Sequence, residues 1–289
     1  MSSPGSLLRS ALGKFVRVWE PWLLWFAHSI ERRFGRVPAP PAVTAKAVCA
    51  VDLVTGAQIL AKNAWLATPP ASLTKLATAI VFARASEGRW HERVEVRAQD
   101  LCSGSTMGLA AGDVITRQDV LYGMILPSGN DAAMVAARLV GPHWREGINA
   151  LASEFGMART RFLTPDGRDA RWQFSTARDL ASLAAAAFAV PRIRLAAATS
   201  HHEVRVGGPN QRTLTLTSTV QMLGEPHVVA GKTGSTPGAR GCLALLVEKA
   251  GKEAVVVLLG ATVAFDALGK VVEVSDRRYD DARGIIRSL

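Results

Sequence analysis

Apolar and polar positions form two different patterns along this chain, one near its ends and another in its middle. Residues 45–52 and 58–62 predict two strands joined by a tight turn, and the apolar runs 242–247 and 254–259 predict two more. In between, apolar residues recur every three or four positions, which is typical of helices that bury one face. We therefore expect an α+β fold, with one sheet built from both chain ends and a helical region of roughly residues 85–200 inserted between its halves.

Capping and breaking residues place the ends of several helices. A helix is expected to begin at Ser72, because Pro69-Pro70 precede it and one apolar face follows. Another is expected to begin near Thr176, with Asp179 completing a capping start, and to end at Pro191. Further helices are predicted near residues 120–125, 144–155 and 279–289, and the alternating segment 213–217 predicts another strand.

Residues 1–41 differ from the rest of the chain in composition. They hold six Lys/Arg against two acids, and three of the seven tryptophans, with apolar residues at helical spacing over 15–30. The apolar run is too short to span a bilayer, whereas cations and aromatic rings on one helix suit a membrane surface. We expect a membrane-surface contact through residues 15–30, then a Pro-rich linker at 37–41 and a folded domain over 42–289. A helix docked on that domain and a misassigned start codon are the alternatives.

Charge, cysteines and histidines narrow the choice of partners. The net charge of +10 fits an anionic substrate, an anionic membrane or nucleic acid, and equally an Arg-rich coding bias. No basic-aromatic motif supports nucleic acid, so we do not expect that partner. Three well-separated cysteines lack zinc-ligand spacing, and the neighbours His201 and His202 would point to opposite faces of a strand. We expect no metal and no cofactor.

The segment Ser72-Leu73-Thr74-Lys75 brings a nucleophile and a base within reach of each other. Residues three apart share one helix face, so Lys75 can lie beside the Ser72 hydroxyl. A serine becomes a nucleophile when a neighbour removes its proton. A lysine can do this when burial or a second cation, here Lys232, lowers its pKa. In isolation, a capping serine and a solvated lysine would be the more ordinary interpretation.

A second polar segment, Ser128-Gly129-Asn130, lies between an apolar run and a helix. Ser128 can relay a proton to a leaving amine, and Asn130 can hold Lys75 and a substrate amide. An ordinary turn followed by a helix cap is the alternative interpretation.

A third segment, Lys232-Thr233-Gly234, resembles the end of a phosphate-binding loop, but Pro226 stands where that motif requires its first glycine. On a strand edge, Lys232 and Thr233 can instead bind a carboxylate, and Gly234 allows a substrate backbone to approach closely. The amides of Ser235 and Ser72 can then form an oxyanion hole.

Together and in this order, the three segments resemble the motifs of the penicillin-recognising serine enzymes, most closely the low-molecular-mass D-alanyl-D-alanine carboxypeptidases. The surroundings are similar too, with Pro70-Ala71 before Ser72, Asp131 after the second motif and Ser235-Thr236 after the third. The resemblance covers about residues 43–289. It implies a β-lactamase/DD-peptidase-like fold, in which helices flank a five-stranded antiparallel sheet and the site lies between the sheet and a helical subdomain.

The resemblance also implies an activity. Ser72 would attack the penultimate D-Ala of a peptidoglycan pentapeptide stem, expel the terminal D-Ala, and react with β-lactams as inhibitors. The enzyme would act in the periplasm or elsewhere in the cell envelope. The catalytic residues would be Ser72, Lys75, Ser128 and Asn130, and the substrate-binding residues Lys232, Thr233, Gly234, Ser235 and Thr236, with Arg240 the best additional carboxylate binder because it follows the third motif closely.

Several positions depart from the family pattern. Thr164-Pro165-Asp166-Gly167 stands where the family has Asn-Pro-His-Gly, Arg168 takes the place of a frequent Leu, and Ser235 that of His or Tyr. The chain also ends soon after its last helix, where many relatives continue into a β-rich domain and a membrane helix. We therefore expect the N-terminal segment to be the anchor instead.

Two alternative functions remain open. A catalytically idle module that binds peptidoglycan would keep the fold, and the altered turn around Thr164 to Arg168 suits it. A class A-like β-lactamase would share the fold and motifs. It would need a Glu-x-x-Leu-Asn stretch between the second and third motifs, and the chain has none.

Overall fold

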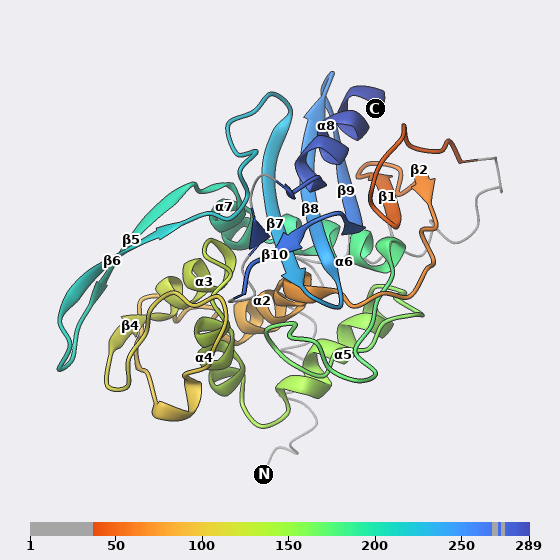
Figure 1. Ribbon diagram of the computed structural model, residues 1–289. Helices are drawn as coiled ribbons and strands as arrows, with labels where there is room; N and C mark the ends of the chain where they lie inside the picture. Colours follow the sequence, from red (N-terminus) through yellow and green to blue (C-terminus); the bar gives the residue numbers. More distant parts are fainter. Residues whose placement is uncertain (1–36, 268–270, 273–274) are drawn as a thin grey trace, which may run out of the picture.

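A five-stranded antiparallel sheet forms the centre of the computed structural model, which describes residues 37–267, 271–272 and 275–289. The strand order is β2-β1-β9-β8-β7 (Figure 1), so strands from the two ends of the chain pair where β1 meets β9. This confirms the expected sheet, and β7 lies at one of its edges. The strand bounds are β1 Ala47–Asp52, β2 Gln58–Lys62, β7 Val228–Thr236, β8 Arg240–Lys249 and β9 Lys252–Ala261.

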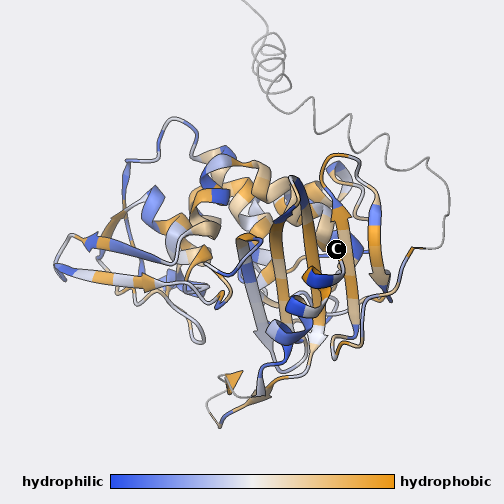
Figure 2. Ribbon diagram, turned by 90° about the horizontal axis from the view of Figure 1, so that it is seen from above, coloured by the Kyte–Doolittle hydropathy of each residue, from blue (hydrophilic) through white to orange (hydrophobic). Residues whose placement is uncertain are grey.

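Helices cover both faces of this sheet, and its central strands are therefore buried at nearly every position. The helix α6 (Ala177–Ala189) packs against β1, β8 and β9, and α8 (Arg278–Ser288) packs against β8 and β9. Successive strand residues point to opposite faces, so Val257 joins the core under α6 and Val256 joins the core under α8. Figure 2 shows the apolar strands in orange between the helices.

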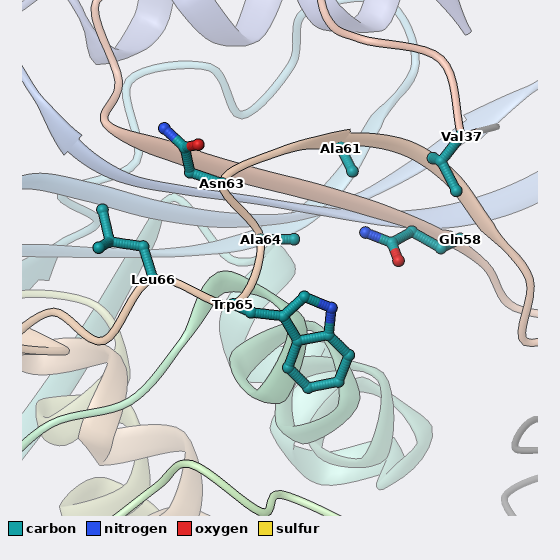
Figure 3. A pocket seen from close by; sticks show the side chains of 7 residues that line it. All are labelled: Val37, Gln58, Ala61, Asn63, Ala64, Trp65 and Leu66. Carbon is teal, nitrogen blue, oxygen red and sulfur yellow. The ribbon is translucent and has the colours of Figure 1, made fainter. Parts of the chain in front are cut away.

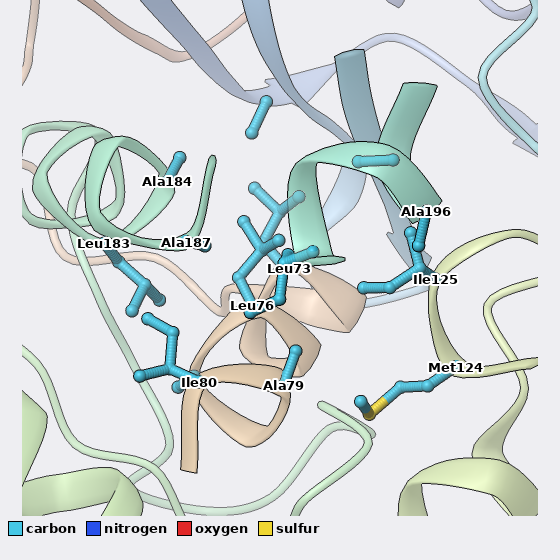
Figure 4. Close-up of a cluster of buried hydrophobic side chains, with 14 of the residues drawn as sticks. Leu73, Leu76, Ala79, Ile80, Met124, Ile125, Leu183, Ala184, Ala187 and Ala196 are labelled. Carbon is cyan, nitrogen blue, oxygen red and sulfur yellow. The ribbon is translucent and has the colours of Figure 1, made fainter. Parts of the chain in front are cut away.

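The helix that follows the Ser72 motif lies at the centre of the helical region. Ser72 itself belongs to a single 3-10 turn, η1 (Ala71–Leu73), and α2 (Thr74–Ala85) begins two residues later than the sequence predicts. The expectation of one buried face was wrong, because α2 is buried almost all round. Figure 4 shows α2 side chains such as Leu76 and Ile80 among those of neighbouring helices. Those neighbours include α3 (Arg117–Ile125), α4 (Asn130–Val140), α5 (Trp144–Glu154), α6 and α7 (Pro191–Ala198).

The inserted region also contains short strands. The alternating segment 213–217 does form a strand, but it lies in a separate hairpin and not in the main sheet. His202 fixes this hairpin to α3, since its ring stacks on Tyr122 with centroids 3.9 Å apart. The short elements are β3 (Arg93–Glu95), η2 (Ala98–Asp100), β4 (Val114–Thr116), β5 (His201–Val206), β6 (Arg212–Thr217), β10 (Ala264–Phe265) and β11 (Val271–Val272).

Pro191 follows the end of α6 closely, as expected, but it is also the first residue of α7. The chain bends by 100° between these two helices. Within the described part of the chain, no single helix is both long and apolar enough to cross a membrane. The helix expected over residues 15–30 lies outside the described residues. The linker that follows it runs beside β2, where the Pro38 oxygen accepts a hydrogen bond from Ala61 N at 2.9 Å.

Candidate active site

Ser72 and Lys75 lie together where η1 meets α2. Lys75 Nζ lies 2.9 Å from Ser72 Oγ, 2.9 Å from Asn130 Oδ1 and 2.8 Å from the backbone oxygen of Asp166. Lys75 is fully buried, whereas Ser72 is partly exposed. The structure therefore brings the predicted nucleophile and base into contact. The 3-10 turn does not prevent this, because residues i and i+3 share a side in that geometry as well.

The contacts of Lys75 match the bonding capacity of a neutral amine, which has two N–H donors and one lone pair. Asn130 Oδ1 and the Asp166 carbonyl can only accept, so they occupy both donors. As an ammonium, Lys75 donates its third N–H to Ser72 Oγ. Once the amine is neutral, the Ser72 hydroxyl can donate its proton to the lone pair instead. Burial lowers the pKa of Lys75 to about 8, although the nearby Asp166 carboxylate opposes that shift. The amine is thus placed to take a proton from Ser72.

The second motif presents one side chain to each of two buried lysines. Ser128 has a φ of 60°, a left-handed conformation that is uncommon for a residue with a side chain. Its Oγ accepts a hydrogen bond from Lys232 Nζ at 2.8 Å. Asn130 begins α4, and its Nδ2 donates to the Ser103 oxygen at 2.9 Å, which turns Oδ1 toward Lys75.

The third motif lies on β7, against the Ser72 turn. A Cβ atom on Gly234 would lie 3.1 Å from both Ala71 Cβ and Ser72 N, so the position suits a residue without a side chain. This contact puts the main chains of β7 and η1 side by side, as an oxyanion hole from Ser72 and Ser235 requires. Thr233 Oγ1 bonds Thr219 Oγ1 at 2.5 Å.

Two residues predicted to bind substrate lie where β7 ends and β8 begins. Thr236 Oγ1 donates to Asp169 Oδ1 at 2.6 Å, and Arg240 pairs with Thr236 in the strand register as β8 begins. Arg240 is exposed, and the described residues include no polar partner for its side chain. Its predicted role as a carboxylate binder stays a prediction.

Lys232 is the second buried lysine of the site. Its Nζ also donates to the Thr233 oxygen at 3.0 Å. Burial lowers the pKa of Lys232 well below its ordinary value, and the positive charges of Lys75 and Arg278 lower it further. The sequence left open whether burial or a second cation, Lys232, would lower the pKa of Lys75, and burial is the largest cause at both residues. Since two cations repel, the pair favours one charged and one neutral amine.

The turn at residues 164–173 packs against η1, the 3-10 turn that contains Ser72. Gly167 has a φ of 84°, and a Cβ atom there would lie 1.9 Å from the Ala71 oxygen, so no other residue fits. Gln173 holds the turn together from inside. Its Oε1 accepts from Leu163 N at 2.8 Å and Thr164 N at 2.9 Å, and its Nε2 donates to the Arg168 oxygen at 2.8 Å.

The residues of this turn that depart from the family pattern make specific contacts. Asp166 has no exposed surface, and its Oδ2 lies 2.5 Å from Arg168 Nε. This contact is an ion pair without the geometry of a directed hydrogen bond. Asp169 accepts from Thr236 and from Gly238 N at 3.0 Å, which ties the turn to the β7–β8 hairpin.

Two buried charged residues support the site although the sequence gave neither of them a role. Arg278 donates to the Gly234 oxygen at 3.0 Å and pairs with Asp276 at 2.7 Å. Asp131 accepts from the backbone nitrogen atoms of residues 107–109. Only Asp131 gave a local signal, because it follows Asn130 directly; Arg278 lies 44 residues from Gly234 in the chain.

A cavity of about 650 Å³ lies among residues outside this site, beside the junction with the N-terminal segment (Figure 3). Val37, Gln58, Trp65 and Leu66 are among its lining residues, and Trp65 and Leu66 are 50% and 44% exposed. Within the described residues, no cluster of three or more His, Cys, Asp or Glu side chains could hold a metal ion.

Comparison with known proteins agrees with the motifs. The family described as D-alanyl-D-alanine carboxypeptidase, peptidase S11, matches residues 35–263, which include all three motifs. D-alanyl-D-alanine carboxypeptidase DacF of Bacillus subtilis is 27% identical over 262 residues, covering 88% of this chain and 67% of the relative. DacC of Escherichia coli is 32% identical over 238 residues, covering 76% of this chain and 58% of the relative. The chain thus spans about two thirds of the length of DacF and less of DacC.

Solved structures confirm the expected fold. The DD-transpeptidase of Streptomyces K15 superposes with a TM-score of 0.76 at 25% identity, covering 86% of this chain and 97% of that one. The D-alanyl-D-alanine carboxypeptidase of Mycobacterium tuberculosis H37Rv superposes with a TM-score of 0.75 at 26% identity, covering 89% and 94%. Together with the family match over most of the chain, these likenesses show that the chain belongs to the D-alanyl-D-alanine carboxypeptidase family of serine peptidases.

Proposed function

We propose that this chain is a serine D-alanyl-D-alanine carboxypeptidase that acts on peptidoglycan stem peptides through an acyl-enzyme on Ser72. One observation carries the proposal: Lys75 Nζ lies 2.9 Å from Ser72 Oγ, while two carbonyl oxygens occupy its N–H donors. With both carbonyl oxygens bound, a neutral Lys75 has only its lone pair left toward Ser72, so it can accept the serine proton.

In the first step, Lys75 accepts the Ser72 proton as Oγ attacks the carbonyl carbon of the penultimate D-Ala. The oxygen of that carbonyl gains negative charge where η1 meets β7, and the amides of Ser72 and Ser235 donate to it. Because Lys75 is fully buried, the proton stays inside the site until a leaving group takes it.

In the second step, the bond between the carbonyl carbon and the amine nitrogen breaks. Lys232 and Thr233 bind the carboxylate of the terminal D-Ala. Ser128, which contacts Lys232 at 2.8 Å, passes a proton to the departing amine and takes in its place the proton held by Lys75, so the proton removed from Ser72 leaves with D-Ala. D-Ala departs, and the acyl part of the substrate stays bound to Ser72 as an ester. Water then adds to the ester and restores the serine hydroxyl, and the same ester chemistry makes β-lactams inhibitors.

Covalent labelling tests this proposal. We expect a fluorescent penicillin to give a persistent band on a denaturing gel with the wild type and none with Ser72→Ala, while Ser153→Ala, on α5, labels normally. D-Ala release from a pentapeptide should show the same dependence. No label and no D-Ala release from the wild type would instead favour an idle binding module, and rapid nitrocefin hydrolysis would favour a β-lactamase.

We also propose that the protein works in the cell envelope, with residues 15–30 on a membrane surface. The proposed substrate is a cell-wall peptide, and exposed Trp65 and Leu66 flank the junction with the N-terminal segment, suiting an interfacial position. The full chain should co-sediment with anionic phospholipid vesicles, and Trp22→Ala should weaken this. Fusion of residues 1–41 to a periplasmic reporter tests export, and an inactive reporter would contradict the envelope location.

A further inference from the structure

The proposed reaction sets the direction in which a substrate lies along β7. The terminal carboxylate lies at Thr233 and the scissile carbonyl near Ser235, so the acyl part of the substrate continues toward Thr236. At that end, the turn at residues 164–173 closes on the strand through the hydrogen bond from Thr236 to Asp169, 2.6 Å long. The acyl part of the substrate must therefore pass this turn as it leaves the site.

The turn contains two arginines, Arg168 and Arg171, and Arg168 is the one that pairs with a buried carboxylate. Its Nε lies 2.5 Å from Asp166 Oδ2, and its backbone N donates to Asp166 Oδ1 at 3.2 Å. The Asp166 side chain is completely buried, whereas the Arg168 side chain is 47% exposed. A buried carboxylate thus fixes the inner edge of the guanidinium and leaves its outer edge facing solvent.

The outer edge of Arg168 is available to a ligand. Within the described residues, neither Nη atom of Arg168 makes a hydrogen bond, and Nε is the atom that lies 2.5 Å from Asp166 Oδ2. A guanidinium whose position is already fixed loses little side-chain freedom on binding an anion, and two adjacent Nη atoms match the two oxygens of a carboxylate.

The charge of Arg168 also reaches into the site. Burial raises the pKa of Cys102, and the positive charge of Arg168 is the first influence that opposes this. At Lys75, burial lowers the pKa, and Arg168 adds to that effect. The charge of Arg168 therefore acts on groups of the site, and its neighbour Gly167 packs against the Ser72 turn.

We propose that Arg168 binds a carboxylate carried by the acyl part of the substrate, upstream of the scissile bond, so that the enzyme prefers anionic acyl donors. This rests on the proposed function and names its substrate class. The related turns often have Leu at this position, so the preference would come from residues particular to this chain. Asp166 is the matching departure, because it holds the guanidinium in place.

A pair of isosteric peptides tests the preference. We expect the wild type to hydrolyse N-acetyl-L-Glu-D-Ala-D-Ala with a kcat/KM about twofold to fivefold above that for N-acetyl-L-Gln-D-Ala-D-Ala, since a partly exposed charge pair contributes modestly. Arg168→Gln should bring the ratio near one, and Arg168→Lys should keep part of it. Arg161→Gln removes an equal, exposed charge from the base of the same loop and should keep the full ratio.

Two penicillins separate this proposal from the proposed function. Carbenicillin differs from benzylpenicillin by one carboxylate on the acyl side chain, and we expect the wild type to be acylated faster by carbenicillin, relative to benzylpenicillin, than Arg168→Gln is. Reaction with these compounds and peptides without any carboxylate preference, or with a preference that survives Arg168→Gln, would overturn the Arg168 proposal alone. No reaction with any of the four would overturn the proposed function as well.

Discussion

The two walls of the site are built in different ways. The strand wall, β7 residues 232–236, is positioned by main-chain pairing with β8 and by the packing of Gly234 on the Ser72 turn. The turn wall, residues 164–173, has no sheet behind its centre and relies on a few side chains, chiefly Gln173 and Asp169. Each wall nevertheless ends in contact with the same short turn, η1.

The difference in construction matches a difference in sequence. The strand wall keeps the residues of the family motif up to Gly234, whereas the turn wall departs from the family pattern at Thr164, Asp166 and Arg168. A main chain held by a sheet places its side chains accurately, which the reaction needs. A turn held by a few anchors can change its other side chains while keeping its shape. We infer that chemistry and substrate preference are divided between the two walls.

The largest expected effect is at Lys75, where the two walls and α2 meet. Lys75→Met keeps the length of the side chain but removes the base, and should lower the rate of acylation by penicillin about 10³-fold or more. Lys62→Met is the matched control, because Lys62 Nζ likewise donates to two carbonyl oxygens, those of Val43 and Ala45, but lies in β2. Stopped-flow acylation rates measure both, and an active Lys75→Met would refute the proton transfer.

Two glycine variants compare the walls directly. Gly167→Ala should destabilise the protein by ~2–4 kcal/mol and slow acylation about 100-fold, because its Cβ would meet the Ala71 oxygen at 1.9 Å. Gly234→Ala should cost ~1 kcal/mol and about tenfold in rate, because its nearest contacts of 3.1 Å need only a small shift.

Thermal and urea unfolding, with acylation kinetics, measure these effects. Gly88→Ala controls for backbone strain alone, because Gly88 has a φ of +73° but open space around its Cβ position. Equal effects of Gly167→Ala and Gly234→Ala would contradict the difference between the walls.

The pH dependence of acylation tests whether Lys75, which lies where the two walls meet, is the base. Burial lowers the pKa of Lys75 to about 8, and only the neutral amine can accept the Ser72 proton. The second-order rate with benzylpenicillin should therefore rise about tenfold per pH unit below pH 8, about 100-fold from pH 6, and level off above pH 8. A flat profile between pH 6 and pH 8 would show that a different group is the base.

The smallest effect on the rate of acylation is expected at Gln173, which holds the turn wall together from inside. Gln173→Leu removes three hydrogen bonds to the backbone of the turn and should cost ~1–3 kcal/mol of stability and about fivefold in acylation. Gln118→Leu, whose amide makes one long contact of 3.4 Å to Arg192, should have little effect. If both variants behave alike, Gln173 does not hold the turn.

Local patterns in the chain were sufficient to predict the central strands, the order of the motifs and the contact of Ser72 with Lys75. Alternation, apolar runs and a spacing of three residues express themselves over a few positions, so they can be recognised without knowing the rest of the molecule. The same reasoning failed for the single buried face of α2, which is buried on nearly every side. It predicted the strand at 213–217 correctly but not its pairing with β5 outside the main sheet.

The electrostatics of the site required the tertiary structure. Lys75 meets Asn130 from 55 residues away and the Asp166 oxygen from 91, and Lys232 meets Ser128 across 104. Burial is the main cause of the lowered pKa at both lysines, and burial depends on helices and strands that pack from distant parts of the chain. The sequence by itself named the reacting groups, whereas only their packing decided which groups each lysine bonds and how far its pKa falls.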